Sequence, residues 1–311
     1  MILSKTDRRF KAVDALLIIM MIVPILIGIA VKVLFTPPSE GVSINGALIY
    51  FTIPMPLQDF PVTEAQLNSV LVIMIIFFLC LYMTHGLKER PELKRQHFAE
   101  MIIESTEKLV RGNMGEHFMG FAPFIASIMA ISAFSSLMSL FGLFPATSDI
   151  NIVGGWAILV FGIITYYKLK CGPLNYLKGF AEPVAVFAPI NFVSEFATPV
   201  SMAFRHYGNV LSGIVVSALL GTALQGLSAK VFSWAKNISW LDWLADAPLL
   251  QAGIPGVLSI YFDVFSGLLQ AFIFATLTML YVSGAFNLEL FNERKKNKQK
   301  KKAEKAQNIK N

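Results

Sequence analysis

The sequence predicts an all-α, polytopic membrane protein with about six membrane-embedded helices and one amphipathic surface helix. Of its 311 residues, 55% are hydrophobic and only 15% are charged, and the mean hydropathy is +0.61. A soluble domain averages about 45–50% apolar and about 25% charged residues, so this chain has too little polar surface to form ordinary soluble domains. Its two cysteines, Cys80 and Cys171, form no disulfide framework and no metal-ligand spacing.

Six apolar runs are candidates to cross a bilayer, which takes about 20 residues. They cover about 15–34, 69–84, 118–144, 153–168, 188–227 and 254–285. The fifth and sixth are longer than a crossing needs, and the fifth predicts one strongly tilted or broken helix. A basic start precedes the first run, so a cleaved signal peptide is the alternative there. Its apolar core is long for such a peptide, and no small-residue cleavage site follows it.

A helix of another kind is predicted at 96–112. Its apolar residues recur along one side and its charged residues lie elsewhere. The apolar side consists of Phe98, Met101, Ile102, Leu109 and Val110. This pattern is typical of a helix that lies on the membrane surface, and a solvated linker is the alternative.

Basic residues gather before the first run and after the second, fourth and sixth runs. Residues 294–311 alone carry nine basic residues against one acid, so the formal net charge of +6 describes a tail and indicates no nucleic-acid-binding body. Because cytoplasmic loops collect Lys and Arg, both termini are predicted to be cytoplasmic. The tail is expected to be disordered, with a weaker attraction to anionic lipid.

Polar residues form a stripe along the fifth run, at spacings of three, four or seven residues. They are Asn191, Glu195, Thr198, Arg205, Asn209 and Ser212. A lipid-facing helix would not carry such a stripe. A buried hydrogen-bonded seam between helices would explain the Ser, Thr and Asn residues alone.

Arg205 makes that simpler explanation insufficient. No acidic residue lies three or four positions away, and Glu195 is about 15 Å off at 1.5 Å per residue. A charge at mid-membrane costs about 2.5–3.5 kcal/mol even on the mild insertion scale. We therefore predict that a carboxylate reaches Arg205 from elsewhere, in this chain or another, and that the residue is functional.

The sixth run offers one acid, Asp263, and its helical face also carries Ser259, Ser266, Gln270 and Phe274. Antiparallel packing of the last two runs would set Gln270 near the depth of Arg205, and Asp263 near Ser212. The result is a polar route from outside, a fixed positive charge, and a separate route to the inside. Arg cannot deprotonate in a protein, whereas Asp and Glu can exchange protons.

Three segments carry a resemblance to a known family: PINFVSEFATPVSMAFRHYGNVLSG (189–213), LLQAFIFATLTMLYV (268–282) and SLFGLFPATSDINI (139–152). Over roughly 69–285 the chain resembles subunit a of the F-type ATP synthases, the stator channel beside the rotating ring of c subunits. The resemblance implies that the last two runs form a long tilted hairpin. It also implies that the chain is not an enzyme by itself, needs no cofactor and moves protons, with Na⁺ as the alternative ion because the c-subunit ring carries the ion-binding site.

The family's invariant Arg corresponds to Arg205, its following Asn to Asn209 and its late Gln to Gln270. The ionisable group of the outer half-channel can sit on either of the last two helices, and here Ile214 occupies one site and Asp263 the other. The resemblance thus implies an outer proton path and an inner one. The outer path comprises Asp263, Asn209, Gln270 and Ser212, and the inner path comprises Glu195, Thr198 and Ser201.

The resemblance also implies partners and a location. Expected partners are the c-subunit ring, whose carboxylate faces Arg205, the b-subunit peripheral stalk, the rest of the complex and membrane lipid. The chain divides into an extra N-terminal transmembrane helix with an external loop (1–68), a subunit a core (69–287) and a basic tail (288–311). The N-terminal helix and the basic tail are additions to the family core, and their length indicates a bacterial plasma (inner) membrane.

Two residues depart from the family pattern. His206 replaces an apolar residue after the Arg, and we favour a packing or interfacial role over a second proton carrier. Ser139 stands where Asn is common, which leaves the contribution of the third run open.

Two other functions are considered. A stand-alone secondary transporter with a midplane Arg binding an anionic substrate is the main alternative, although no repeat halves are visible. A membrane-embedded hydrolase is weaker, because the four histidines are scattered without metal-ligand spacing.

Overall fold

The computed structural model describes residues 5–36, 46–56, 58–87, 93–180, 185–231, 256–258, 260–288, 291–292 and 296. The α-helices are α1 (Lys5–Phe35), α2 (Glu64–Thr84), α3 (Lys94–Met114), α4 (Ala122–Leu137), α5 (Ile150–Cys171), α6 (Pro173–Phe180), α7 (Ala188–Val231) and α10 (Gly267–Gly284). Short 3-10 segments are η1 (Glu116–Phe121), η2 (Met138–Phe141), η3 (Ala146–Ser148) and η4 (Ala185–Phe187), and η6 (Ile260–Ser266) is a π-helix. Of the predicted tail 288–311, only 288, 291–292 and 296 are described.

The structure contains the predicted six candidate membrane-spanning helices. The described residues contain six helices long and apolar enough to cross a bilayer: Phe10–Phe35, Glu64–Thr84, Glu116–Phe141, Ile150–Cys171, Ala188–Ser228 and Gly256–Gly284. They match the six apolar runs in number and order. Outside them the structure adds an antiparallel hairpin of β1 (Ile49–Ile53) and β2 (Phe60–Thr63), which the sequence analysis did not predict.

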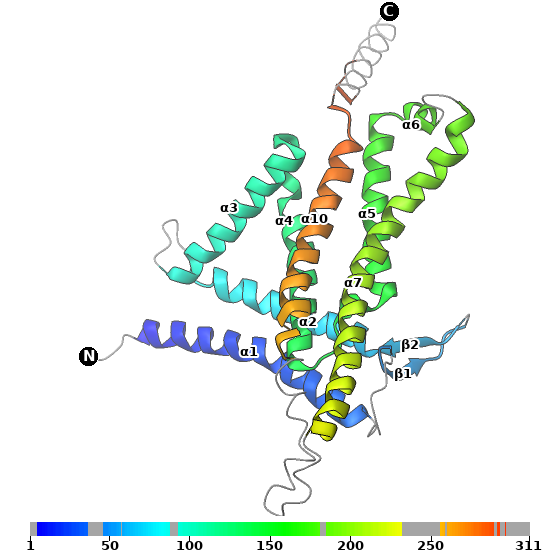
Figure 1. Ribbon diagram of the computed structural model, residues 1–311. Coiled ribbons are helices and arrows are strands. Elements are labelled where there is room, and N and C mark those ends of the chain that lie inside the picture. Colours follow the sequence, from blue (N-terminus) through cyan, green and yellow to red (C-terminus); the bar gives the residue numbers. More distant parts are fainter. Residues whose placement is uncertain are drawn as a thin grey trace, which may run out of the picture.

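The spans lie in two directions (Figure 1). Helices α4, α5, α7 and α10 run alongside one another, with the closest packing between α10 and α4 and between α5 and α7. Helices α1 and α2 pack on each other and run across the lower part of this group. The pair α1 and α2 and the group of α4, α5, α7 and α10 therefore cannot both be parallel to the membrane normal.

Helix α7 is the longest element. Its 44 residues span about 66 Å at 1.5 Å per residue, more than twice the hydrocarbon thickness of about 30 Å. To keep that length in or near a bilayer the helix must be steeply inclined. Pro199 lies inside it and has no N–H to donate to the carbonyl of Glu195, four residues earlier.

Ion pairs fasten α1 at both ends. Near its start, Asp14 contacts Arg95 at 2.7 Å and His85 at 2.9 Å. Near its end, Lys32 pairs with the buried carboxylate of Glu64 at 3.2 Å and donates to the Gly142 carbonyl at 2.6 Å. The first apolar run is thus docked onto α2 and the segments that flank it.

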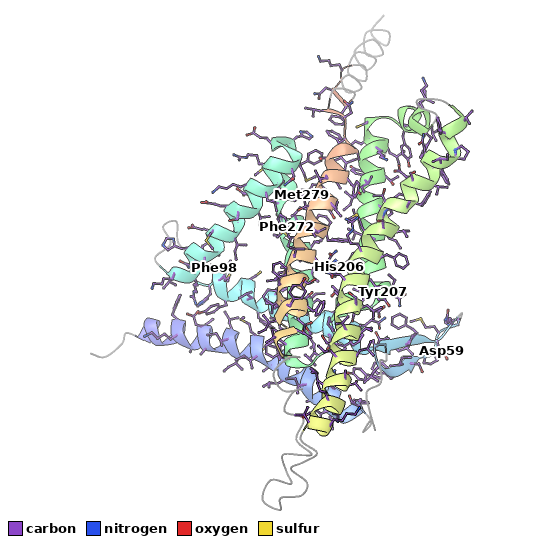
Figure 2. The ribbon with its side chains drawn as sticks, viewed as in Figure 1. Asp59, Phe98, His206, Tyr207, Phe272 and Met279 are labelled. Carbon is purple, nitrogen blue, oxygen red and sulfur yellow. The ribbon has the colours of Figure 1, made fainter. Side chains whose placement is uncertain are left out.

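The helix predicted at 96–112 is present as α3, and it packs on the protein through Thr106, Val110 and Met114. The first part of its apolar side is not covered by described residues, since Phe98 (labelled in Figure 2), Met101 and Ile102 are all exposed. This half is free to contact lipid.

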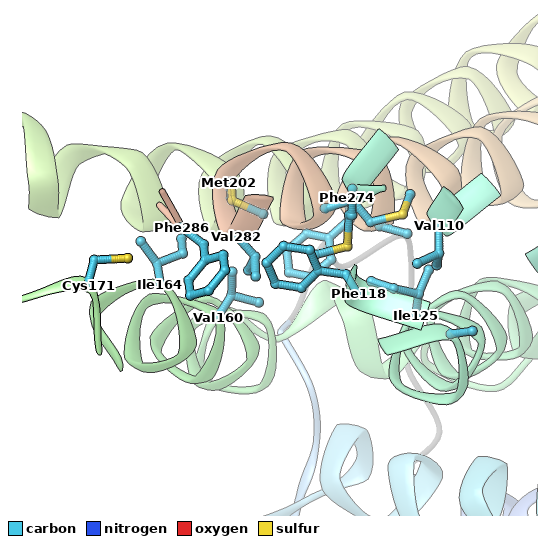
Figure 3. Close-up of a cluster of buried hydrophobic side chains, with 14 residues drawn as sticks. Val110, Phe118, Ile125, Val160, Ile164, Cys171, Met202, Phe274, Val282 and Phe286 are labelled. Atoms are coloured by element: carbon cyan, nitrogen blue, oxygen red, sulfur yellow. The ribbon is translucent and has the colours of Figure 1, made fainter. Parts of the chain in front are cut away.

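The main core lies between α3, α4, α5 and α10 (Figure 3). It includes the buried side chains Val110, Phe118, Ile125, Val160, Ile164, Cys171, Met202, Phe274, Val282 and Phe286. Met202 comes from α7, so the core fixes one side of that helix. The opposite side of α7 stays uncovered by described residues, with Phe192, Val193 and Phe204 exposed.

Candidate functional site

The polar stripe runs along α7, and Arg205 lies near the middle of the helix beside the labelled His206 (Figure 2). Met202, Ala203 and His206 are buried against neighbouring helices, whereas Arg205 is exposed. Within the described part of the chain, Arg205 has no hydrogen-bond or ion-pair partner. The guanidinium is therefore available to a group outside the described residues.

The register between α7 and the last helix is set by contacts on the far side of Arg205 from Glu195. Asn209 Nδ2 donates to Ser266 Oγ at 2.9 Å, and Ser266 Oγ lies 3.1 Å from Asn209 Oδ1. Gly213 packs closely against Phe262. A Cβ atom added to Gly213 would lie only 3.1 Å from the Cβ of Phe262.

In an antiparallel pair, each step forward along one helix is a step back along the other. Since Asn209 meets Ser266, Arg205 is level with Gln270, and Ser212 is level with Asp263. This is the register that the sequence analysis predicts. Gln270 is buried, with 4% of its surface exposed, so the structure sets a buried amide at the depth of the exposed guanidinium.

Asp263 lies in the π-helix η6 and is half-buried. A π-helix has a wider turn than an α-helix and occurs mostly as short insertions, often at functional sites. The predicted face through Asp263, Ser266 and Gln270 assumed a regular α-helix, so η6 rotates Asp263 relative to that expectation. Ser212 donates its hydroxyl to the Asn209 carbonyl at 2.9 Å. Ser259, predicted on the same face, lies outside the described residues.

Toward the start of α7, Glu195 has partners that the sequence analysis missed. Lys168 Nζ, at the end of α5, contacts both carboxylate oxygens at 2.6 and 2.7 Å. The Glu195 carboxylate also lies near the hydroxyl of Tyr176, on α6. Burial first, and then the nearby carboxylate, raise the pKa of Tyr176 above its usual range.

Two cavities adjoin the Lys168–Glu195 pair, and both are lined by Lys168, Asn191 and Glu195. One, of about 270 Å³, extends past Tyr176 and Phe180. The other, of about 330 Å³, extends along α7 and is also lined by Ser194, Thr198 and Pro199. Thr198 thus lines a cavity with Glu195, whereas Ser201 is exposed and lines neither.

His206 is fully buried, and its Nε2 lies 3.2 Å from Ser132 Oγ on α4. Its ring meets the rings of Trp156 and Phe274 edge-on, at 6.0 and 5.4 Å between centroids. Nδ1 has no hydrogen-bond partner within the described residues. This environment supports the packing role over a second proton carrier.

Two further expectations concern side chains off the stripe. Ser139 donates its hydroxyl to the Ser136 carbonyl at 2.6 Å, which occupies that hydroxyl within its own helix segment. Across the described ranges, no three His, Cys, Asp or Glu side chains are grouped to hold a metal ion.

The fold and site together define a polytopic membrane protein with charged and hydrogen-bonding side chains at several depths along its spanning helices, an arrangement suited to moving ions. A family model described as ATP synthase A chain matches residues 67–283, and the chain belongs to this family. It is subunit a, the non-catalytic, ion-translocating stator subunit of the ATP synthase complex. This assignment decides against the stand-alone transporter.

Bacterial relatives agree with the family assignment. Subunit a of Macrococcus caseolyticus is 29% identical over 67% of this chain and 84% of its own length, and that of Bacillus pumilus is 29% identical over 70% and 91%. The "ATP synthase subunit a, sodium ion specific" of Propionigenium modestum is 28% identical over 80% of this chain and 87% of its own length.

Proposed function

We propose that this subunit conducts protons through two half-channels that are offset along α7, with Arg205 between them. The carrying observation is the α7–η6 register. It aligns the Asn209–Ser266 pair on one side of the guanidinium, while the Glu195–Lys168 pair lies ten residues away on the other side. Polar groups on both sides with a fixed charge between them can pass protons to and from a separate carrier.

The outer half-channel of this proposal uses Asp263, Asn209, Ser212 and Gln270. Asp263 lies level with Ser212, in a helix segment whose backbone is wider than an α-helix. Protons would enter past Asp263 and Asn209 and neutralise a carboxylate of the c-subunit ring. The buried amide of Gln270 would mark the inner end of this path, level with Arg205.

The inner half-channel uses Glu195, Thr198 and Ser201. Its support is the cavity of about 330 Å³ that extends from Glu195 to Thr198. The exposed Ser201 lies one turn further toward Arg205. A protonated ring carboxylate that has rotated through lipid would release its proton here, after which Arg205 would bind the ionised carboxylate.

The proposal requires partners on the uncovered side of α7. Arg205 and the apolar residues Val193, Phe204 and Leu219 are exposed, a pattern that fits a ring of c-subunit helices with one buried carboxylate each. The b-subunit peripheral stalk would hold the chain still against that ring. We place the protein in a bacterial plasma membrane with both termini cytoplasmic, on the distribution of basic residues.

The first test is ATP-driven acidification of inverted vesicles that contain matched amounts of the assembled complex. Arg205→Ala is expected to abolish pumping while passive proton leak is retained or raised, because the barrier between the half-channels is lost. Lys230→Ala, near the end of the same helix, is the control and should pump normally. Undiminished pumping by the Arg205 variant would refute the proposal.

The transported ion needs its own test, because one relative is described as sodium ion specific. If the ion is H⁺, ATP-driven acidification should proceed at the same rate with and without Na⁺, and a protonophore should collapse it. A sodium pump would instead accumulate ²²Na⁺ in the presence of the protonophore. That outcome would replace H⁺ by Na⁺ and leave the half-channel geometry intact.

A further inference from the structure

The Lys168–Glu195 ion pair lies where the two cavities at the start of α7 meet. Both cavities are lined by Lys168, Asn191 and Glu195. One extends toward α6, past Tyr176 and Phe180, and the other extends along α7 toward Thr198, on the Arg205 side. The ion pair therefore forms part of the wall that the two cavities share.

The pair is short, two-pronged and partly buried. Lys168 Nζ contacts both carboxylate oxygens, at 2.6 and 2.7 Å, and the side chains are 30% and 12% exposed. Both oxygens of Glu195 are thus engaged by one ammonium group, and the Tyr176 hydroxyl lies near this carboxylate. A group that binds to Glu195 must therefore compete with Lys168 for the carboxylate oxygens.

Lys168 has space into which it can move. It is the partner from the last turn of α5, and its ammonium lies 5.7 Å from the centre of the Tyr176 ring. A Lys side chain has a flexible four-carbon stem, so it can exchange one partner for another without moving the helix. The ammonium thus contacts the Tyr176 ring while the ion pair is formed, and this aromatic face on the α6 side can keep hold of it when the pair breaks.

We propose that the Lys168–Glu195 pair is a gate in the inner half-channel, closed when the ion pair is formed and open when Lys168 turns toward α6. The inference rests on the proposed function, since it assigns regulation to that inner path. Lys168 is here a positioning residue that acts through Glu195 and does not itself carry the transported ion.

Thiol accessibility tests the gate in the assembled complex. Thr198→Cys, in a background with Cys80 and Cys171 changed to Ser, is labelled in inverted vesicles with a charged, membrane-impermeant methanethiosulfonate reagent. Adding Lys168→Gln is expected to speed labelling about tenfold, the factor that corresponds to about 1.4 kcal/mol of lost pairing. Lys168→Arg should label slowly, like the parent, because it keeps the pair.

Two controls separate a gate from a general loosening of structure. Lys170→Gln, two residues along the same helix end, should leave the labelling rate unchanged. The charge swap Lys168→Glu with Glu195→Lys should restore slow labelling, which a merely structural role of Lys168 would not produce.

The possible failures are distinguishable. Equal inner-face labelling rates with and without the Lys168→Gln substitution would overturn the gate and leave the half-channel proposal standing. Labelling of Thr198→Cys from the outer face alone, in right-side-out vesicles, would overturn both the gate and the inner path.

Discussion

At the scale of single residues, Arg205 and His206 show how a step of one residue along α7 separates two environments. They are neighbours in sequence, and their side chains leave α7 about 100° apart at 3.6 residues per turn. His206 is fully buried between Ser132, Trp156 and Phe274, whereas Arg205 is exposed. Helix α7 thereby exposes a charged side chain on one side, while its buried side contacts three neighbouring helices, α4, α5 and α10.

A packing role for His206 predicts a specific pattern of stability. His206→Leu leaves the buried Ser132 hydroxyl without its imidazole partner, which costs about 1–3 kcal/mol. His206→Leu with Ser132→Ala should be closer to wild type, because both polar partners are removed together. The measurement is the temperature at which the purified complex loses subunit a. Normal ATP-driven pumping by the double variant is expected, and loss of pumping without loss of assembly would instead identify a proton carrier.

The Asn209–Ser266 pair carries the register on which the outer path depends. Asn209→Leu keeps the branched shape of the side chain but removes both hydrogen bonds to Ser266, so pumping is expected to fall several-fold. Thr222→Val is the matched control, because Thr222 is exposed and its hydroxyl bonds only to its own helix at Ala218. Equal pumping rates for the two variants would argue against an outer path through Asn209.

The stripe on α7 was predictable because helical periodicity alone sets which residues share a face. Antiparallel packing of α7 and α10 predicts that Arg205 and Gln270 lie at the same depth. The contact between Asn209 and Ser266 agrees with that register. Lys168 could not be identified as a partner of Glu195, since the two are 27 residues apart and meet only through tertiary packing. In the sequence, the positive charge of Lys168 is already explained by the tendency of Lys and Arg to gather on the cytoplasmic side of a membrane protein.

At the scale of elements, α4 and α10 approach closely at Gly267. A Cβ added there would lie 2.5 Å from the Ser136 Cβ, so backbone would have to shift. Gly267→Ala is expected to reduce the amount of assembled subunit a, even though Ala favours a helix over Gly by about 1 kcal/mol. Gly284→Ala, at the end of the same helix with open space around it, should assemble normally. Blotting of membranes for subunit a measures both.

Hydropathy predicted the six spans because each contains a stretch of about 18 residues that is strongly apolar on average, even where polar residues interrupt it. It gave no indication of η6. A π-helix differs from an α-helix in its backbone hydrogen bonds, which join residues five apart instead of four apart, and hydropathy does not depend on that difference. The β1–β2 hairpin was missed for another reason. Residues 49–63 carry no alternation strong enough to distinguish a short strand pair from a loop between two helices.

At the scale of the whole molecule, the predicted topology can be tested from both sides. An epitope after residue 311 should be accessible in inverted vesicles only, and one inserted between Gly46 and Ala47 should be accessible in right-side-out vesicles only. Cytoplasmic basic clusters are the physical reason for this expectation. Both epitopes on one face would contradict the predicted five crossings between them, and reversed accessibilities would contradict the predicted orientation.

The cavity that reaches Thr198 has a consequence for how the membrane voltage acts on this protein. Water in such a cavity conducts ions, so the voltage changes little along it and falls mainly across the dry part of the protein that remains. If about 100 mV falls over half of a 30 Å layer, the electric field there doubles, although the work per charge stays at about 2.3 kcal/mol. The residues around Arg205 would then lie where the field is steepest, and a shorter cavity would spread the same voltage over more of α7.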